Sequence, residues 1–217
     1  MRIVIRKAVE SDTEFVIDSI INAEKSGTEK ITYCEIFSIS EEDFRNILHQ
    51  ILEEEIEGFE FCIKNFLVAQ INQKMVGAVS GWIEGTDGMS SSLLKMNAFS
   101  FFLSKTKINS SHQNIKIIEE IGIEREIGCL QLDSVYTLPE YRRQGITGIL
   151  IEAHINQVKK QNPEVKKSQI ILMKENLSAM EAYQKAGFTK VLEKYSENRK
   201  ISEILPGRGK LLLERQL

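Results

Sequence analysis

Residues 130–154 read LQLDSVYTLPEYRRQGITGILIEAH. A strand-like segment leads into Arg142, Arg143 and a turn of small residues, and the chain then continues as an amphipathic helix. The first N–H groups of a helix lack partners within the helix, and the helix dipole adds partial positive charge there, so such a turn binds phosphate. Gly145 has no Cβ, which allows a positive φ and a close approach between backbone and ligand. The stretch therefore predicts an anion site between a strand and a helix.

Two other phosphate-binding loops are excluded by their sequence patterns. A Walker A loop requires Gly-x-x-x-x-Gly-Lys-Ser/Thr, and a dinucleotide loop requires Gly-x-Gly-x-x-Gly near the start of a βαβ unit. Neither string occurs in the chain. An arginine pair on a solvated loop is the ordinary alternative to an anion site, so the interpretation depends on a second pattern.

That second pattern lies between Asn176 and Phe188. Asn176 is a typical helix N-cap, and Gly187 is a typical helix stop. Asn176, Ala179 and Tyr183 are separated by helical spacings of three and four, so they share one helix face on which the small Ala179 leaves room beside the phenol. A tyrosine on a helix is more often half-buried packing, and here the order and spacing of both patterns favour a site.

Together the two patterns resemble the GNAT superfamily of N-acetyltransferases. The family's acyl-coenzyme A pyrophosphate loop is Gln/Arg-x-x-Gly-x-Gly/Ala, and here it reads Arg142-x-x-Gly145-x-Thr147, with a β-branched residue at the last position. The family's second signature, Asn-x-x-Ala-x-x-x-Tyr-x-x-x-Gly-Phe, is matched at every position. The resemblance covers residues 127–217 well and the first hundred residues only by a loose pattern.

The resemblance implies that acetyl-coenzyme A binds as acyl donor. In the family, the strand before the loop diverges from its neighbour and exposes backbone N–H groups that hold the pantetheine arm and the thioester oxygen. The residues implied to bind the donor are Val135, Tyr136, Thr137, Arg142, Arg143, Gln144, Gly145, Ile146, Thr147, Gly148, Asn176 and Tyr183.

Acyl transfer to an amine needs a neutral nucleophile, stabilisation of the oxyanion and a proton for the leaving thiolate. The family signature implies that Tyr183 protonates the sulfur, because a phenol with a reference pKa near 10 is protonated at neutral pH. It also implies that Asn176 positions pantetheine or a bound water. Cys129 as a covalent acyl carrier is disfavoured, since an apolar strand raises the pKa of a thiol, and direct transfer is expected instead.

The general base is the less determined group. Asp133 alternates with Val135 and Thr137 along one strand, so all three are expected on one face, toward the acceptor. We therefore favour Asp133 as the base, directly or through water. The alternatives are that Asp133 only binds the substrate ammonium or caps a loop, or that the amine loses its proton in bulk water.

The expected architecture is a single α/β domain over residues 1–217 with the GNAT acyltransferase fold. Its mixed central sheet should have about six to seven strands flanked by helices. Strands are predicted at 3–7, 65–71, 74–84, 128–137, 168–173, 187–195 and 209–215, and helices at 11–23, after Ser40, at 145–160 and at 177–186.

Residues 85–126 form an insertion between the third and fourth predicted strands. The segment is rich in apolar residues around 93–103 and again around 115–123. Such a segment must bury itself, either over the acceptor pocket or against a second subunit, so a homodimer is possible.

Bulk composition is that of an ordinary globular enzyme. Apolar residues make up 42% and charged residues 27% of the chain, and no apolar run is long enough for a membrane helix. The three cysteines and three histidines are scattered without metal-ligand spacing, so no metal site is expected and the thiols suit a reducing cytoplasm. A net charge of −3 argues against nucleic acid as the main partner.

Charge is distributed unevenly along the chain. Residues 35–60 contain nine acids against Arg45 alone, whereas residues 159–217 contain thirteen bases against seven acids. A basic side suits the phosphates of coenzyme A, and an acidic side would attract a cationic amine. For the acidic run, a solvated helix face is the favoured interpretation.

Two functions remain from the sequence. The first is an acetyl-coenzyme A dependent N-acetyltransferase acting on a primary amine of a small molecule or peptide. The alternative is a non-catalytic module of the same fold that binds acyl-coenzyme A for regulation, because fold alone does not determine function. Retention of Tyr183 and Asn176 favours the enzyme.

Overall fold

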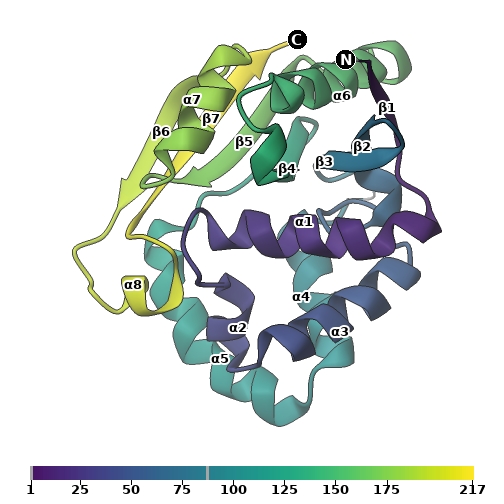
Figure 1. Cartoon of the computed structure of the whole chain (residues 1–217). Coiled ribbons are helices and arrows are strands. Elements are labelled where there is room, and N and C mark those ends of the chain that lie inside the picture. Colours follow the sequence, from purple (N-terminus) through teal and green to yellow (C-terminus); the bar gives the residue numbers. More distant parts are fainter. Residues whose placement is uncertain (1, 87) are drawn as a thin grey trace.

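A mixed sheet of seven strands lies at the centre of the computed structural model, which describes residues 2–86 and 88–217 (Figure 1). The strand order is β1-β2-β3-β4-β5-β7-β6, and every neighbouring pair is antiparallel except the parallel pair β4–β5. The strands are β1 (Ile3–Lys7), β2 (Phe66–Ile71), β3 (Lys74–Ile83), β4 (Leu130–Thr137), β5 (Lys167–Met173), β6 (Thr189–Tyr195) and β7 (Gly209–Gln216). The mixed α/β architecture predicted from the sequence is confirmed.

Helices cover both faces of this sheet (Figure 1). The helices are α1 (Thr13–Lys25), α2 (Thr32–Phe37), α3 (Glu41–Glu53), α4 (Ser91–Phe102), α5 (Lys105–Ile118), α6 (Ile146–Gln161), α7 (Leu177–Lys185) and α8 (Ile201–Ile204). One apolar core joins α1–α5 and α8 to the sheet, and a second core joins α6 and α7 to its other face. The helices α2, α4, α5 and α8 were not among those predicted from the sequence.

Local signals explain why several elements begin and end where they do. The Ser40 side chain accepts a hydrogen bond from the Asp43 N–H at 3.0 Å and the Asp43 carboxylate accepts from the Ser40 N–H at 3.2 Å, which forms a capping box at the start of α3. Between β2 and β3, Asn72 and Gln73 have φ of 49° and 66°, values suited to a tight hairpin turn. Both the capped helix and the hairpin were predicted.

The insertion, of which the structure describes residues 85–86 and 88–126, packs against the rest of the same chain. Helices α4 and α5 pack against the core that also contains α1–α3, with Phe99 fully buried. The buried Glu84 carboxylate accepts hydrogen bonds from the Ser91 N–H at 2.8 Å and from Trp82 Nε1 at 3.0 Å, which fixes the start of α4 beside β3. The insertion therefore buries itself within the chain, near the acceptor end of the cleft described below.

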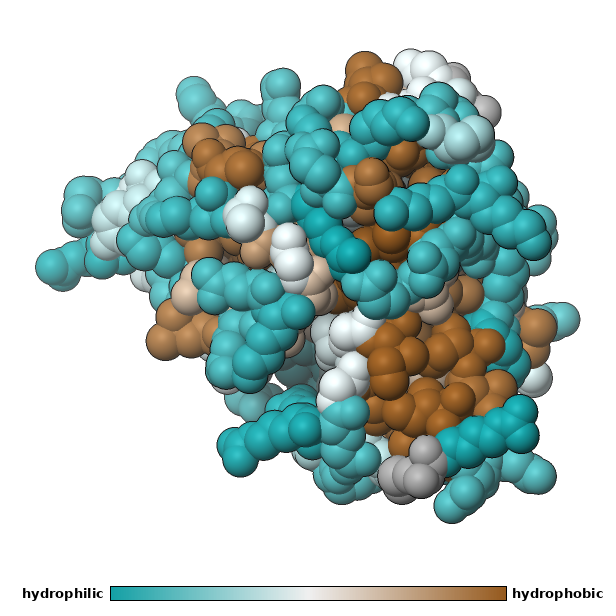
Figure 2. Space-filling view, turned by 90° about the horizontal axis from the view of Figure 1, so that it is seen from above, coloured by the Kyte–Doolittle hydropathy of each residue, from teal (hydrophilic) through white to brown (hydrophobic). Residues whose placement is uncertain are grey.

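Seen from above in Figure 2, hydrophilic side chains cover much of the surface and leave apolar patches between them. Large apolar residues exposed on β1, α6, α7 and β6 are Val4, Ile149, Leu177, Val191, Leu192 and Tyr195. Within the described ranges 2–86 and 88–217, no helix is both long enough and apolar enough to span a bilayer.

Strand β4 contains a bulge that decides which side chains face the cleft. Ala78 pairs with Tyr136 and Ser80 pairs with Asp133, so two residues of β4, 134 and 135, lie opposite the one residue between them on β3. Ser134 takes a φ of 49°, in the left-handed region. The extra residue shifts the alternation of side chains by one position beyond Asp133.

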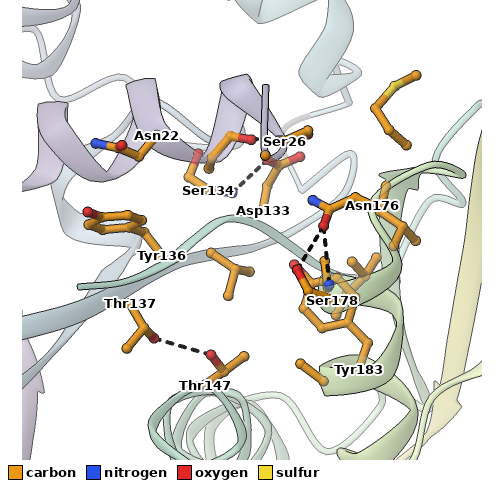
Figure 3. A pocket seen from close by; sticks show the side chains of 18 of the residues that line it. Asn22, Ser26, Asp133, Ser134, Tyr136, Thr137, Thr147, Asn176, Ser178 and Tyr183 are labelled. Atoms are coloured by element: carbon orange, nitrogen blue, oxygen red, sulfur yellow. Dashed lines mark hydrogen bonds between the residues drawn. The ribbon is translucent and has the colours of Figure 1, made fainter. Parts of the chain in front are cut away.

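The expectation that Asp133, Val135 and Thr137 share one face is therefore wrong. Asp133 is directed toward the side of α1, where it pairs with Arg125. Val135 packs against the core beneath α6, and the Thr137 hydroxyl lies 3.2 Å from that of Thr147 on α6 (Figure 3).

Beyond Leu132, β4 and β5 diverge. The parallel register joins only Leu130–Leu132 to Ser168–Ile170, although both strands continue. The predicted divergence of the strand before the anion turn is confirmed, and it opens a gap in the sheet.

His154 on α6 supports β3 opposite the bulge. Its buried ring nitrogen Nε2 lies 3.1 Å from the Val79 carbonyl oxygen, and burial lowers the pKa of the imidazole to about 4. Because this folded pKa lies below the ordinary value of 6.5, stability from the neutral ring is complete above about pH 6.5 and is lost as the pH falls toward 4.

We expect the loss of unfolding free energy from this group to reach about 3 kcal/mol at acid pH. Urea unfolding of the wild type and of His154→Gln, which retains an N–H donor and cannot titrate, should give a smaller acid loss in the variant. An identical loss of unfolding free energy in both proteins would contradict this assignment.

Candidate active site

A cleft of about 1090 Å³ passes through the gap between β4 and β5. One end is lined by the turn before α6 and by α7, and the other end by α1, the insertion and the start of β7. The cleft therefore connects the predicted anion turn to a separate chamber on the α1 side of the sheet.

The turn before α6 has the geometry that the sequence predicted. Gly145 is the N-cap of α6 with a φ of 77°, and Arg143 also lies in the left-handed region with a φ of 62°. A Cβ built on Gly145 or on Gly148 would meet no heavy atom within 4 Å, so space is open beside both residues. Arg142 Nε donates to the Thr137 carbonyl at 3.1 Å, which ties the turn to the end of β4.

This turn fits the diphosphate of a coenzyme A donor. Open space lies against the backbone at the N-terminus of α6, a helix of 16 residues, and two arginines flank the turn. Thr147, where the family pattern has a smaller residue, is directed toward β4 and its hydroxyl is within hydrogen-bonding distance of Thr137 (Figure 3).

Helix α7 lines the same end of the cleft. The Asn176 side-chain oxygen accepts hydrogen bonds from the Ala179 N–H and the Ser178 hydroxyl, both at 3.2 Å, which confirms Asn176 as N-cap (Figure 3). Its NH2 group is the part that can still donate to a ligand. Tyr183 is 7% exposed, and burial raises the pKa of its phenol well above the ordinary value, so the group carries its proton at neutral pH.

The structure brings most of the predicted site residues to this cleft. Gln144 is the exception, since its side chain donates to the Glu140 carbonyl at 3.4 Å outside the cleft lining. Ile146 lines the cleft but is 1% exposed and packs in the core, so its backbone is the part accessible to a ligand. The residues that line the cleft are Asp133, Val135, Tyr136, Thr137, Arg142, Arg143, Gly145, Ile146, Thr147, Gly148, Asn176 and Tyr183.

Cys129 does not line the cleft. Cys129 immediately precedes β4, and burial raises the pKa of its thiol to about 11, as expected for an unreactive thiol.

The chamber on the α1 side contains Asp133, which the sequence predicted, and further charged groups that the sequence did not reveal. Asp133 pairs with Arg125 at 2.6 Å, and Arg125 also donates to Gln131 at 3.1 Å. Lys95 forms an ion pair with Glu60. The further charged residues of the chamber are Glu24 and Lys210.

The charged groups of the chamber come from six separate segments of the chain, so no local sequence motif predicts that they lie together. Glu60 is the one member of the acidic run 35–60 that lines the cleft. The acids of α3 at positions 41–43 and 53 are exposed, in agreement with the favoured interpretation of a solvated face. Lys95 and Arg125 belong to the insertion. Lys95 lies between apolar residues, which was the available signal, whereas Arg125 lies between Glu124 and Glu126 and gave none.

Two of the chamber groups have pKa values shifted toward neutrality. Burial, with the nearby charges of Asp133 and Glu60, raises the pKa of Glu24 to about 7. Burial, with the nearby charge of Lys95, lowers the pKa of Lys210 to about 8. Both groups can therefore change protonation state near neutral pH.

Comparison with known proteins identifies the family. The model of the acetyltransferase (GNAT) family matches residues 33–188. No curated protein sequence matches the chain at a significant level.

Solved structures share the fold across the whole chain. An N-acetyltransferase from Staphylococcus aureus Mu50 is 14% identical, with 98% of this chain and 100% of that chain covered and a TM-score of 0.64. An acetyltransferase from Salmonella typhimurium, solved with its cofactor acetyl-CoA, is 13% identical over 100% and 95% of the two chains, with a TM-score of 0.53. The ribosomal-protein-S18-alanine N-acetyltransferase from Escherichia coli is 13% identical over 99% and 94%, with a TM-score of 0.51.

The family match spans the bulged strand, the anion turn and the helix that carries Tyr183. The chain belongs to the acetyltransferase (GNAT) family, and it is an acyltransferase by class.

Proposed function

We propose that this protein is an N-acetyltransferase that transfers an acetyl group from acetyl-CoA directly to a primary amine of a small molecule or peptide. The observation that carries the proposal is the continuous cleft through the β4–β5 gap, with Gly145 and Tyr183 on one side and Glu24 in the chamber on the other. A donor held at the first end and an acceptor held at the second would meet at the gap.

Acetyl-CoA supplies the acetyl thioester when it binds. The backbone around Gly145 and the side chains of Arg142 and Arg143 would hold its phosphates. Backbone N–H groups of Val135–Thr137, beyond the last residue paired with β5, would hold the pantetheine arm and donate to the thioester oxygen. The NH2 group of Asn176 would donate to pantetheine or to a bound water.

Tyr183 is proposed as the general acid. Its raised pKa keeps the phenol protonated, so it can donate a proton to the sulfur as the carbon–sulfur bond breaks. Tyr183 lies on α7, on the donor side of the gap, which suits contact with a leaving thiolate (Figure 3).

The general base that accepts the amine proton is proposed to lie on the other side of the gap, in the chamber beside α1. Asp133, favoured from the sequence, is already paired with Arg125 at 2.6 Å, and protonating it would break that ion pair. Glu24 forms no ion pair within the described parts of the chain, and its pKa of about 7 suits a group that accepts a proton at neutral pH. We therefore propose Glu24 as the base and Asp133 as the group that positions Arg125.

The proposal is tested by free-thiol release from acetyl-CoA across a panel of primary amines. We expect amine-dependent release with an equal yield of N-acetylated amine by mass spectrometry. Saturable binding of acetyl-CoA without release for any amine would favour the non-catalytic module instead.

Removing the two arginines should weaken donor binding. We expect Arg142→Ala combined with Arg143→Ala to raise the Kd for acetyl-CoA by about 10-fold to 100-fold, because two charged phosphate contacts are lost. Arg45→Ala, a half-exposed arginine on α3 outside the cleft lining, is the control. Equal affinity in the double variant and the control would mean that the phosphates bind elsewhere.

A further inference from the structure

We infer that the acceptor is a small aminocarboxylate, whose carboxylate binds Lys210 and whose amine lies against Glu24 and Glu60. This inference rests on the proposed function and names the substrate class of the same site. It comes from the charges of the chamber that remain without an opposite partner.

The chamber pairs most of its charges internally. Arg125 and Asp133 form one ion pair, and Lys95 and Glu60 form another. Aromatic rings also contact these cations: Lys95 lies 5.6 Å from the centre of the Tyr33 ring, and Arg125 lies 4.9 Å from the centre of the Trp82 ring. These paired groups are thereby fixed in place and form the walls of the chamber.

Lys210 is the cation that remains. It lies at the start of β7, next to Met173 on β5, and it lines the cleft. Within residues 2–86 and 88–217 its ammonium group has no ion pair or hydrogen bond to a side chain. The groups whose charges act on it are Lys95 and Arg125, which repel it, and Glu24 and Asp133, which attract it.

Lys210 is half-buried, and a partly desolvated ammonium without a counter-ion is costly, so desolvation lowers the pKa of Lys210 to about 8. A carboxylate brought by a ligand would remove that cost. Lys210 can therefore bind an anionic group. Glu60 and Asp133 are occupied by the two internal ion pairs, and Glu24, the remaining carboxylate of the chamber, forms no ion pair with Lys210 within the described residues.

Glu60 offers the complementary feature. Its side chain is buried with 3% of the residue exposed, Oε1 is engaged by Lys95, and Oε2 has no hydrogen-bond partner in the structure. An orphan carboxylate oxygen in a buried site is expensive, and the N–H of a bound amine would satisfy it. Glu24 lines the same chamber and supplies the proton acceptor.

The balance of charge selects among amines. The chamber contains three acids, Glu24, Glu60 and Asp133, and three bases, Lys95, Arg125 and Lys210. A polyamine would bring several positive charges to a set that is already balanced, and a simple alkylamine would leave Lys210 unpaired. A zwitterion brings a carboxylate to Lys210 and an amine to the unpartnered Oε2 of Glu60, and a short one suffices because Lys210, Glu60 and Glu24 line the same chamber.

The test compares each amino acid with its carboxamide. Glycine, L-alanine and β-alanine and their amides are assayed for thiol release, and their binding to the protein with coenzyme A is measured by calorimetry. We expect kcat/KM to favour the carboxylates by at least about 10-fold, an ordinary value for one buried charge-assisted contact. The amines of the amides are less basic, so a larger fraction of them is neutral and nucleophilic at neutral pH. Intrinsic reactivity therefore favours the amides, and a preference for the carboxylates must come from binding.

Lys210→Met should reduce the carboxylate-to-carboxamide ratio of kcat/KM to near one, and Lys210→Arg should restore part of it. Lys190→Met, an exposed lysine on neighbouring β6, is the matched control and should keep the wild-type ratio.

The outcomes separate the two proposals. Equal turnover or equal affinity for acids and amides overturns the aminocarboxylate inference and leaves the acetyltransferase intact. Tighter binding of the acids without thiol release supports the chamber assignment while the proposed transfer fails. If Lys210→Met leaves the carboxylate-to-carboxamide ratio of kcat/KM unchanged, Lys210 does not bind the carboxylate and the inference is wrong.

Discussion

Tyr183→Phe is expected to lower kcat by about 100-fold with little change in the Kd for acetyl-CoA. The phenol is buried and protonated, and its proton is needed when the thiolate leaves, so its loss acts on the transition state more than on the bound donor. Phe retains the ring that packs in the core beside α6 and α7, which keeps folding intact. Single-turnover thiol release and calorimetry of the donor measure the two quantities separately.

Tyr195→Phe provides the control for this experiment. Tyr195 is at the end of β6, 43% exposed and away from the cleft lining. Its variant should match the wild type in both assays. An unchanged kcat in Tyr183→Phe would reject the acid role, and a large loss of donor affinity would assign Tyr183 to binding instead.

Glu24→Gln is expected to lower kcat/KM by about 100-fold at neutral pH and to abolish an inflection near pH 7 in the wild-type profile. In the wild type, activity should rise as the pH passes through this value, because only the deprotonated carboxylate accepts the amine proton. The groups that act on Glu24 are Asp133 and Glu60, which raise its pKa, and Lys95 and Thr32, which lower it.

A pH profile measured as kcat/KM from about pH 5.5 to 9 separates this role from a structural one. Glu29→Gln is a suitable control, since Glu29 is an exposed acid close in sequence to Glu24. If Glu24→Gln retains the wild-type inflection, the base is another group, and Asp133 becomes the leading candidate.

Much of the donor side could be predicted from the sequence because its determinants are local. A glycine with positive φ, an Asn N-cap and a tyrosine at helical spacing each act within a few residues of chain. The capped helix after Ser40 and the hairpin at residues 72–73 were predictable for the same reason.

The acceptor side could not be predicted, because it depends on non-local geometry. Regular alternation predicts that Asp133 and Val135 lie on the same face of the sheet. The bulge at Ser134 puts them on opposite faces, and no glycine or proline in the sequence indicates that bulge. The chamber then gathers Glu24, Lys95 and Lys210 from segments far apart in the chain. Their proximity follows from the packing of the insertion and of α1 on the sheet.

The central claim is that the turn at Gly145 holds the diphosphate of acetyl-CoA. Isothermal titration calorimetry of the protein with acetyl-CoA tests it most directly. The account predicts saturable binding at one site per chain, weakened by the combined Arg142→Ala and Arg143→Ala changes. Absence of saturable heat at millimolar acetyl-CoA, or full affinity in the double variant, would contradict it.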